Sequence, residues 1–260
     1  MKRLTLCLLA GLLPSAAHAQ SDDAPREPRR YRVVLGAEVS PSFPGARRMP
    51  VQPLWDYSIA RGDTPFAFDA TDDSPGFTLA KIGGVEFGGV FDFQNGRDYR
   101  RAGIQGSGDT LELGGFAQAM LAPWLRAHVE LRRGINGHDA WTGNAGLDLI
   151  QRDGDKHVFA IGPRLTFGDA RYQRAFFGVT PAESAASGLT AFAPDGGIHA
   201  VGANAGYLRQ FGRHWGLYSY LKYDRLTGSA AESPLVRAEG SRNQLSAGLA
   251  LSVTFGGKRS

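Results

Sequence analysis

Residues 243–255 read Asn-Gln-Leu-Ser-Ala-Gly-Leu-Ala-Leu-Ser-Val-Thr-Phe. From Leu245 to Phe255 every second residue is apolar, and the residues between them are small or polar, apart from Ala250. Successive side chains of a β-strand point to opposite faces, so this alternation predicts a strand with one apolar face and one polar or small face. The same period of two recurs upstream along almost the whole chain.

The alternating segments predict about twelve strands, and an even number allows a barrel to close. Many of them are near the ~10 residues that a tilted strand needs to cross a bilayer. Their second faces mix charged residues and glutamine with glycine, which suits a hydrated or hydrogen-bonded lumen and leaves the apolar faces to lipid. We therefore predict an all-β fold, a transmembrane antiparallel β-barrel of outer-membrane type. The predicted strands are residues 31–40, 51–60, 65–81 with a break near Ser74-Pro75-Gly76, 85–93, 110–121, 125–132, 141–150, 158–167, 172–178, 199–211, 215–226 and 243–255.

Composition agrees with a single large β domain. The 260 residues include 35 glycines and 14 prolines, which is too many for a helical bundle. An apolar share of 42% is too high for a disordered chain, and a mean hydropathy of −0.24 is too low for a helical membrane protein. The net charge is only +4 and the arginines are scattered, which argues against nucleic acid as a partner.

The first residues have the features of a secretory signal peptide. Lys2 and Arg3 precede the apolar residues 4–13, and residues 17–19 read Ala-His-Ala, which is typical of a cleavage site. We expect cleavage between Ala19 and Gln20, export, and location in the outer membrane of a Gram-negative cell. Cleavage would remove the single cysteine and two positive charges, so the mature chain would have no thiol and a net charge of +2. The predicted divisions are a signal peptide (1–19), a flexible periplasmic leader (20–30), the barrel (31–255) and a short C-terminal tail (256–260).

Loop lengths predict the orientation of the barrel, because outer-membrane barrels have short periplasmic turns and long external loops. The predicted strands place the short turns 61–64, 134–138, 168–170 and 212–214 on the periplasmic side, and the long loops 41–50, 179–198 and 227–242 outside. Residues 94–109 are an exception, a long segment on the predicted periplasmic side. Four arginines in the outer loops would either bind lipopolysaccharide phosphates or form an ordinary solvated surface: Arg47, Arg48, Arg237 and Arg242.

Two stretches also fit helical patterns. Residues 117–128 have apolar residues at helical spacing, but Pro123 lies inside them, which favours two strands joined by a turn. Residues 180–183 read Thr-Pro-Ala-Glu, a capping box with proline at the first helical position, and Gly188 supplies a stop. We predict a short helix inside the long loop.

The sequence predicts no catalytic, cofactor-binding or metal-binding residues. The histidines left after cleavage lack zinc-site spacing, and the nucleophile-elbow, P-loop and dinucleotide motifs are missing. His128 and Glu130 share one face of a predicted strand, so with a serine from a neighbouring strand they could act as in a barrel-embedded lipid hydrolase. The alternative is a lumen hydrogen-bond network with Arg126 and Arg132. We prefer the network, because no serine has a spacing that marks it as the partner.

Several runs of the chain resemble the outer-membrane protein V family, also called murein-transglycosylase-interacting or MipA-like scaffolding proteins. Residues 223–236 read Tyr-Asp-Arg-Leu-Thr-Gly-Ser-Ala-Ala-Glu-Ser-Pro-Leu-Val, and their Ser-Pro step is the most specific part of the match. The other matching runs are residues 177–180, 185–189, 42–45 with Arg48 and Pro50, 95–97 before Gly108-Asp109, and the last strand.

This resemblance implies an outer-membrane barrel without catalytic activity or cofactor that holds a lytic murein transglycosylase and a peptidoglycan synthase together. A partner that works on murein must meet the periplasmic side. We therefore predict that residues 94–109 dock it, through Arg97, Asp98, Arg100 and Arg101.

A small-solute channel is the competing interpretation. A barrel of about twelve strands encloses more lumen than the side chains of an eight-stranded barrel fill. The candidate lumen-lining residues are Arg32, Glu38, Glu86, Asp92, Glu112, Arg126, His128 and Glu130.

Overall fold

The computed structural model describes residues 27–257. The predicted signal peptide, its cleavage site at Ala19 and Gln20, most of the leader and the last three residues of the tail lie outside this range. The described part contains eleven strands and four helices. The strands are β1 (Arg29–Val39), β2 (Val51–Arg61), β3 (Gly76–Ile82), β4 (Val85–Gln94), β5 (Thr110–Ala122), β6 (Leu125–Gly134), β7 (Trp141–Asp153), β8 (His157–Gly168), β9 (Gly197–Gln210), β10 (Trp215–Leu226) and β11 (Asn243–Gly256).

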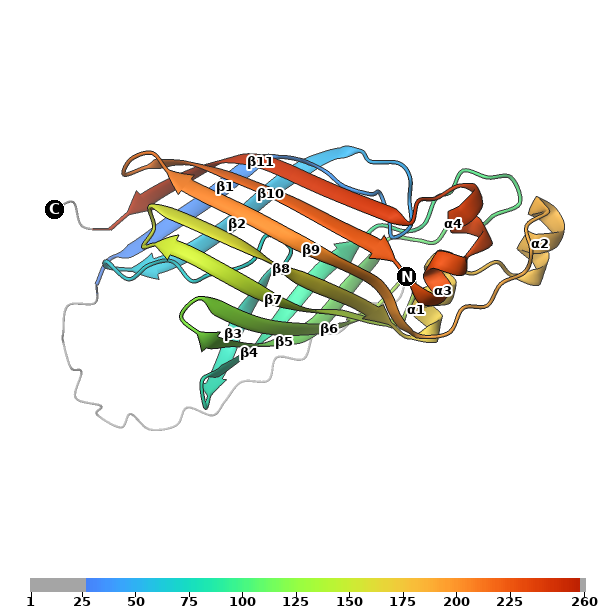
Figure 1. Ribbon diagram of the computed structural model, residues 1–260, viewed down its shortest axis with the longest axis horizontal. Helices are drawn as coiled ribbons and strands as arrows, with labels where there is room; N and C mark the ends of the chain where they lie inside the picture. The colour runs from blue at the N-terminus through green and yellow to red at the C-terminus, as the bar shows by residue number, and fades with distance from the viewer. Residues whose placement is uncertain (1–26, 258–260) are drawn as a thin grey trace, which may run out of the picture.

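One antiparallel sheet in the order β2-β1-β11-β10-β9-β8-β7-β6-β5-β4-β3 forms the barrel wall, which confirms the predicted fold class (Figure 1). The first and last strands pair directly, with Tyr31 opposite Phe255. Within residues 27–257, β2 and β3 are the two strands with an unpaired edge. Ten successive antiparallel pairings separate them, so β2 and β3 run in the same direction.

For two of the twelve strands predicted from the sequence, the structure shows something else over part or all of the predicted range. Of residues 65–81, only the part from Gly76 is a strand, and the residues before it run through the barrel. Residues 172–178 lie in helix α1 (Ala170–Phe177) and its C-cap. The Asp169 carboxylate accepts a hydrogen bond from the Tyr172 N–H at 2.7 Å, which caps this helix. The barrel therefore has eleven strands instead of twelve.

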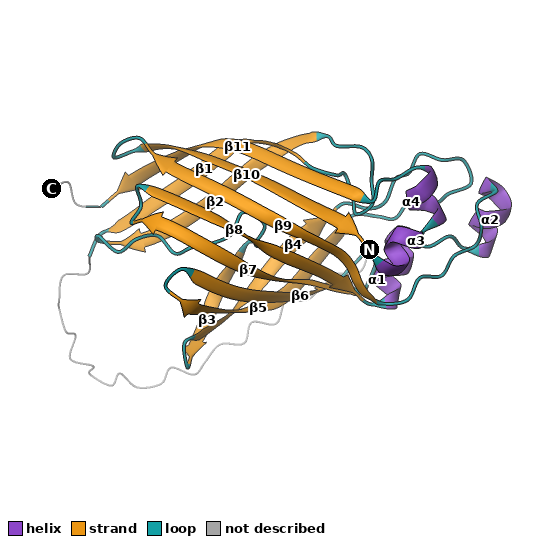
Figure 2. Cartoon of the chain, viewed as in Figure 1, coloured by secondary structure: helices purple, strands orange, loops and turns teal. Residues whose placement is uncertain are grey.

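These two differences in strand assignment change which loops lie at the same end of the barrel. Figure 2 shows the helices and long loops at one end of the barrel, which we call the loop end, and short turns at the other, the turn end. Residues 95–109, 135–140 and 169–196 all lie at the loop end, because the chain passes through the barrel once before β3. The prediction that residues 94–109, 134–138 and 168–170 lie at the same end as the turns 61–64 and 212–214 is therefore wrong.

The outer surface of the strands is apolar. Leu249, Leu251 and Phe255 of β11 are about half exposed, as are many of their counterparts on the other strands. Trp124 and Trp215 lie at the turn end and Trp141 at the loop end, each 44–58% exposed. A band of exposed apolar residues with aromatic residues near both edges is the surface of a barrel that contacts lipid.

A hydrophobic core closes the loop end. Helix α1 packs with α3 (Gly228–Glu232), α4 (Pro234–Ala238) and the preceding loops around fully buried residues such as Phe177 and Leu235. Helix α2 (Pro181–Ser187) has the predicted capping box, and Gly188 ends it in the left-handed conformation at φ 74°. We call these four helices, with residues 40–50 and 95–109, the cap. None of the four is long and apolar enough to cross a membrane.

Candidate functional site

The most unusual feature of the barrel is the segment that joins β2 to β3. Two parallel strands cannot be joined by a short hairpin, so residues 62–75 return from the turn end to the loop end. They do so inside the barrel, where they contact β6, β8, β9 and β10. We call residues 62–75 the crossing segment.

At the turn end, Phe66 anchors the crossing segment. Its side chain is 1% exposed and lies under the guanidinium groups of Arg30 and Arg32, at 4.9 and 4.0 Å from the ring centre. Its backbone N–H donates to Asp155 Oδ1 at 3.1 Å, and its carbonyl accepts from Arg152 at 3.0 Å. Aromatic, charged and backbone contacts therefore all fix this point.

Farther along the lumen, two adjacent carboxylates bind cations from three strands. Asp72 accepts from Arg164 Nε at 2.9 Å and Asn204 Nδ2 at 2.7 Å, and Lys222 Nζ lies 3.1 Å away. Asp73 accepts from Arg126 Nη1 at 2.7 Å. Buried charges are tolerated when they are paired and hydrogen-bonded, and here the pairs hold the segment in place.

Asp148 of β7 joins these pairs into one network. It accepts from Arg126 Nε at 2.9 Å and from Arg164 Nη2 at 2.6 Å. A second group lies nearer the loop end, where Glu112 accepts from Arg132 Nε and contacts His138 Nε2, both at 2.9 Å. The inside of the barrel is thus a continuous set of charge-assisted hydrogen bonds.

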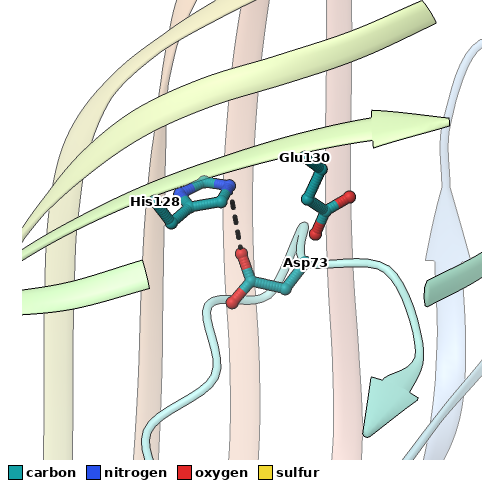
Figure 3. A group of neighbouring side chains, drawn as sticks. All are labelled: Asp73, His128 and Glu130. Carbon is teal, nitrogen blue, oxygen red and sulfur yellow. Dashed lines mark ion pairs between the residues drawn. The ribbon is translucent and has the colours of Figure 1, made fainter. Parts of the chain in front are cut away.

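Figure 3 shows His128 and Glu130 of β6 pointing toward Asp73 on the crossing segment. His128 Nε2 lies 2.8 Å from Asn144 Oδ1 and 3.5 Å from Asp73. Ser74 Oγ donates to Glu130 Oε2 at 2.8 Å and accepts from Arg132 at 2.9 Å.

This arrangement is a hydrogen-bond network, and it does not form the nucleophile–base pair of a hydrolase. The serine that reaches the pair comes from the crossing segment and bonds Glu130, while none of the hydrogen bonds among residues 27–257 joins a serine to His128. The oxygen and nitrogen atoms of Asp73, His128 and Glu130 lie within 4.8 Å of one another, which is close enough for a shared metal ion. Arg126 and Arg132 already neutralise the two carboxylates, so the residues fit a metal ion poorly.

The structure places all eight candidate lumen residues on the inward faces of their strands. Five are at most 6% exposed: Arg32, Glu112, Arg126, His128 and Glu130. The other three are partly buried and make hydrogen bonds or ion pairs, Glu38 with Tyr220, Glu86 with Lys81 and Asp92 with Arg132. The crossing segment and the cap both stand in the path of a solute, so this arrangement does not favour a channel.

Sequence reasoning missed the residues that hold the crossing segment: Asp72, Asp73, Ser74, Asp148, Arg164 and Lys222. A signal was present in Asp72-Asp73. Two adjacent carboxylates in a membrane strand would place one of them toward lipid, which is costly.

The predicted docking residues belong to the cap. Arg97 is 7% exposed and donates to Glu183 Oε1 at 2.6 Å and to the Gly178 carbonyl at 2.8 Å. Burial would raise the pKa of Glu183, but backbone N–H groups of Thr180 and Gln105 and the Arg97 guanidinium together lower the pKa below its ordinary value of 4.5. Arg101 forms an ion pair with Glu239 of the loop after α4. Of the four predicted docking residues, only Asp98 and Arg100 are exposed. Residues 94–109 thus brace the cap at the loop end and cannot meet a partner at the turn end.

The outer arginines also lie at the loop end. Arg47, Arg48 and Arg237 are exposed and Arg242 is half-buried, and Arg47 Nε donates to the Gly240 carbonyl at 3.1 Å. An isolated bridge between Ala46 and Gly240 brings the first and last long loops together.

A cavity of about 460 Å³ is lined by residues of the crossing segment and of β2 and β3, the two strands with an unpaired edge. Its lining includes the exposed aromatic residues Trp55, Tyr57 and Phe77 as well as the carboxylates Asp56 and Asp73. The cavity therefore extends from the gap in the wall to the ion-paired lumen.

Comparison with known protein families gives a match over most of the chain. The model of the family described as MltA-interacting protein MipA matches residues 33–255. No curated protein matches the chain.

Solved structures give only distant matches. The translocator domain of autotransporter NalP from Neisseria meningitidis aligns at TM-score 0.39 with 11% identity, covering 92% of this chain and 90% of its own. OmpT (in-vitro folded), an outer membrane protein of Vibrio cholerae, aligns at TM-score 0.36 with 8% identity, covering 92% and 100%. Likenesses this distant carry no argument about function.

Proposed function

Because the chain belongs to the family of the MltA-interacting protein MipA, we propose that it is a scaffold for murein synthesis and turnover. The family match over residues 33–255 confirms the predicted family and carries this proposal. The chain is an outer-membrane β-barrel protein. In the proposed role it has no catalytic activity, and it binds a lytic murein transglycosylase and a peptidoglycan synthase.

The partner surface in this proposal is the turn end. Short turns face the periplasm in outer-membrane barrels, and murein lies on that side. The described chain also begins and ends at the turn end, with the Gly257 N–H donating to the Arg29 carbonyl at 2.9 Å. The charged residues exposed there include Asp63, Asp153, Lys156 and Arg213.

Affinity capture with matched charge reversals tests the scaffold and its surface. The tagged barrel is purified from gently solubilised envelopes, and co-purifying proteins are identified by mass spectrometry. We expect murein hydrolases or synthases, and we expect Lys156→Glu/Arg213→Glu at the turn end to reduce their capture. The control, Arg48→Glu/Arg237→Glu at the loop end, reverses the same number of exposed charges.

The outcomes separate the scaffold from its surface. A folded barrel that captures no murein enzyme would contradict the scaffold itself. Capture that falls with the loop-end variant and persists with the turn-end variant would contradict the partner surface. Binding of lipopolysaccharide by the outer arginines, which is part of this proposal, predicts that the loop-end variant loses retention of lipopolysaccharide and keeps the murein enzymes.

A further inference from the structure

The gap between β2 and β3 leaves two rows of backbone groups unpaired in the barrel wall. All seven residues of β3 are exposed, and lipid offers no hydrogen bonds to a strand edge. Since β2 and β3 run in the same direction, a single strand running from the turn end to the loop end would be antiparallel to both. The crossing segment runs in that direction.

The turn that such a strand needs is already formed. The Thr64 N–H donates to the Arg61 carbonyl at 3.1 Å, and Gly62 has φ 52°. A two-residue Gly-Asp turn between strands is a standard hairpin connection. Only the residues after Thr64 would have to swing from the lumen toward the wall.

The residue pattern of the crossing segment fits the gap. In the hairpin register set by this turn, residues 64–71 lie opposite Arg61 through Leu54. Phe66, Phe68 and Ala70 then lie opposite Ile59, Tyr57 and Trp55, which form the exposed lipid side of β2. Ala67, Asp69 and Thr71 would face the lumen with Ser58, Asp56 and Leu54. This alternation is the reason that the sequence predicts a strand over residues 65–81.

We infer that residues 62–75 have two alternative positions in this barrel: the lumen position described above, and a wall position in which residues 64–71 form a twelfth strand between β2 and β3. Each position pairs a different set of polar groups. The lumen position pairs Asp72 and Asp73 with Arg164, Lys222 and Arg126 and leaves two strand edges unpaired. The wall position pairs the edges and releases these carboxylates.

More than one contact favours the lumen position, which is the one observed. In the wall position Asp69 would lie directly opposite Asp56, and like charges at opposed positions of neighbouring strands destabilise the pairing. The ion pairs of Asp72 and Asp73 favour the lumen position in addition. The cavity of about 460 Å³ between the segment and the gap provides the space through which it moves. A segment with two such competing sets of contacts is a two-state element.

The wall position would change the inside of the barrel. Arg126, Arg164 and Lys222 would lose Asp72 and Asp73 and retain only Asp148 and Asp224 as acidic partners. The wall would then be a closed barrel with an even number of strands, and the crossing segment would no longer occupy the lumen.

Two disulfide pairs that share one cysteine distinguish the positions. A Cβ added at Gly206 lies 3.8 Å from the Thr71 Cβ, which suits a disulfide, so Thr71→Cys/Gly206→Cys reports the lumen position. In the wall register Thr71 lies opposite Leu54, so Thr71→Cys/Leu54→Cys reports the wall position. Strands β10, β11 and β1 separate Gly206 from β2, so the two sites are four spacings of about 4.8 Å apart along the wall.

Both pairs are placed in the mature chain, which has no other cysteine if cleavage occurs as predicted, and are oxidised in outer-membrane vesicles. We expect the Gly206 pair to form readily and the Leu54 pair to form in a smaller fraction. Asp72→Asn/Asp73→Asn should raise that fraction and lower the fraction of the Gly206 pair. Thr71→Cys alone is the control for intermolecular disulfides, and migration of unheated samples in detergent gels shows that each barrel is folded.

The inference is overturned if the Leu54 pair fails to form in folded barrels in both backgrounds while the Gly206 pair forms. Formation of the Leu54 pair with a reciprocal loss of the Gly206 pair in the Asp72→Asn/Asp73→Asn background supports it. Neither result depends on which partner the barrel binds, so this test is independent of the scaffold proposal.

Discussion

The cap and the crossing segment both occupy the inside or the end of the same barrel, but different forces hold them. The cap is built on apolar residues such as Phe177, Leu235 and Val236, each at most 2% exposed. Beyond its anchor at Phe66, the crossing segment is held by ion pairs between Asp72 or Asp73 and cations on three strands. An apolar core has no competing arrangement that satisfies it equally well, whereas a carboxylate can exchange one partner for another.

This difference assigns different roles to the two regions. The cap is a fixed closure of the loop end, while the crossing segment is the part whose position can change. Substitutions that create cavities in the cap core should therefore loosen the cap alone, and substitutions that break the ion pairs of the lumen should loosen the crossing segment alone.

The largest effect is expected for Phe177→Ala. Its side chain is fully buried in the cap core, and removing a buried phenylalanine costs about 3–5 kcal/mol. Hydrogen exchange of α1 and α4 measures the loss as faster amide exchange. Phe93→Ala, at a lipid-facing position that is 71% exposed, is the matched control and should leave the cap unchanged. Equal protection of the crossing segment in both variants is required, because a loss there would show that the two regions are not independent.

Arg126→Met should have the next largest effect, on the crossing segment. It leaves Asp73 without its guanidinium partner, and breaking a buried ion pair by removing one member costs about 3 kcal/mol. Exchange of the amides of residues 66–74 should accelerate, with α1 and α4 unaffected. Adding Asp73→Asn to Arg126→Met removes the orphaned charge and should restore part of the protection. An additive loss in the double variant would mean that the pair does not hold the segment.

The strands could be predicted from the sequence because side chains along a barrel strand alternate between lipid and lumen, which gives the sequence a period of two. The last strand shows this most clearly, because its six alternating apolar residues, from Leu245 to Phe255, all lie on its outward face. The capping box at Thr180 could also be predicted from the sequence, because its hydrogen bonds join residues only three positions apart.

The crossing segment could not be predicted from periodicity. Phe66-Ala67-Phe68 alternates as a membrane strand does, and the signals against a continuous strand are the adjacent Asp72-Asp73 and the break expected at Ser74-Pro75-Gly76. Tyr172–Gly178 was misread for a related reason, since a short aromatic run fits both periods. The Asp169 N-cap and the Tyr172–Phe176 spacing were the signals of a helix.

Acid should loosen the cap through Glu183. Its pKa is lowered in the folded state, so the carboxylate stabilises the cap fully above its ordinary value of 4.5 and loses that contribution as pH falls through the lowered pKa. Exchange of α2 amides, followed below pH 4.5 and corrected for the intrinsic exchange rate, should therefore show declining protection. Glu183→Gln should remove this part of the pH dependence, whereas Glu232→Gln at an exposed position in α3 should retain it. An unchanged pH profile in Glu183→Gln would mean that the lowered pKa contributes nothing to the cap.

The smallest effect is expected at the N-cap threonines of two cap helices, Thr180 of α2 and Thr227 of α3. Thr180 Oγ1 accepts the Glu183 N–H of α2 at 3.2 Å, whereas Thr227 precedes α3 without a side-chain cap bond. Thr180→Ala should cost about 1 kcal/mol in local stability of α2, since it removes an N-cap oxygen. Thr227→Ala should cost α3 less, because no such bond is lost. Amide exchange within each helix measures both. Since α2 contributes none of the residues fully buried in the cap core, its loosening should leave the protection of α1 and α4 intact, and that would show the closure of the loop end to rest on the apolar core.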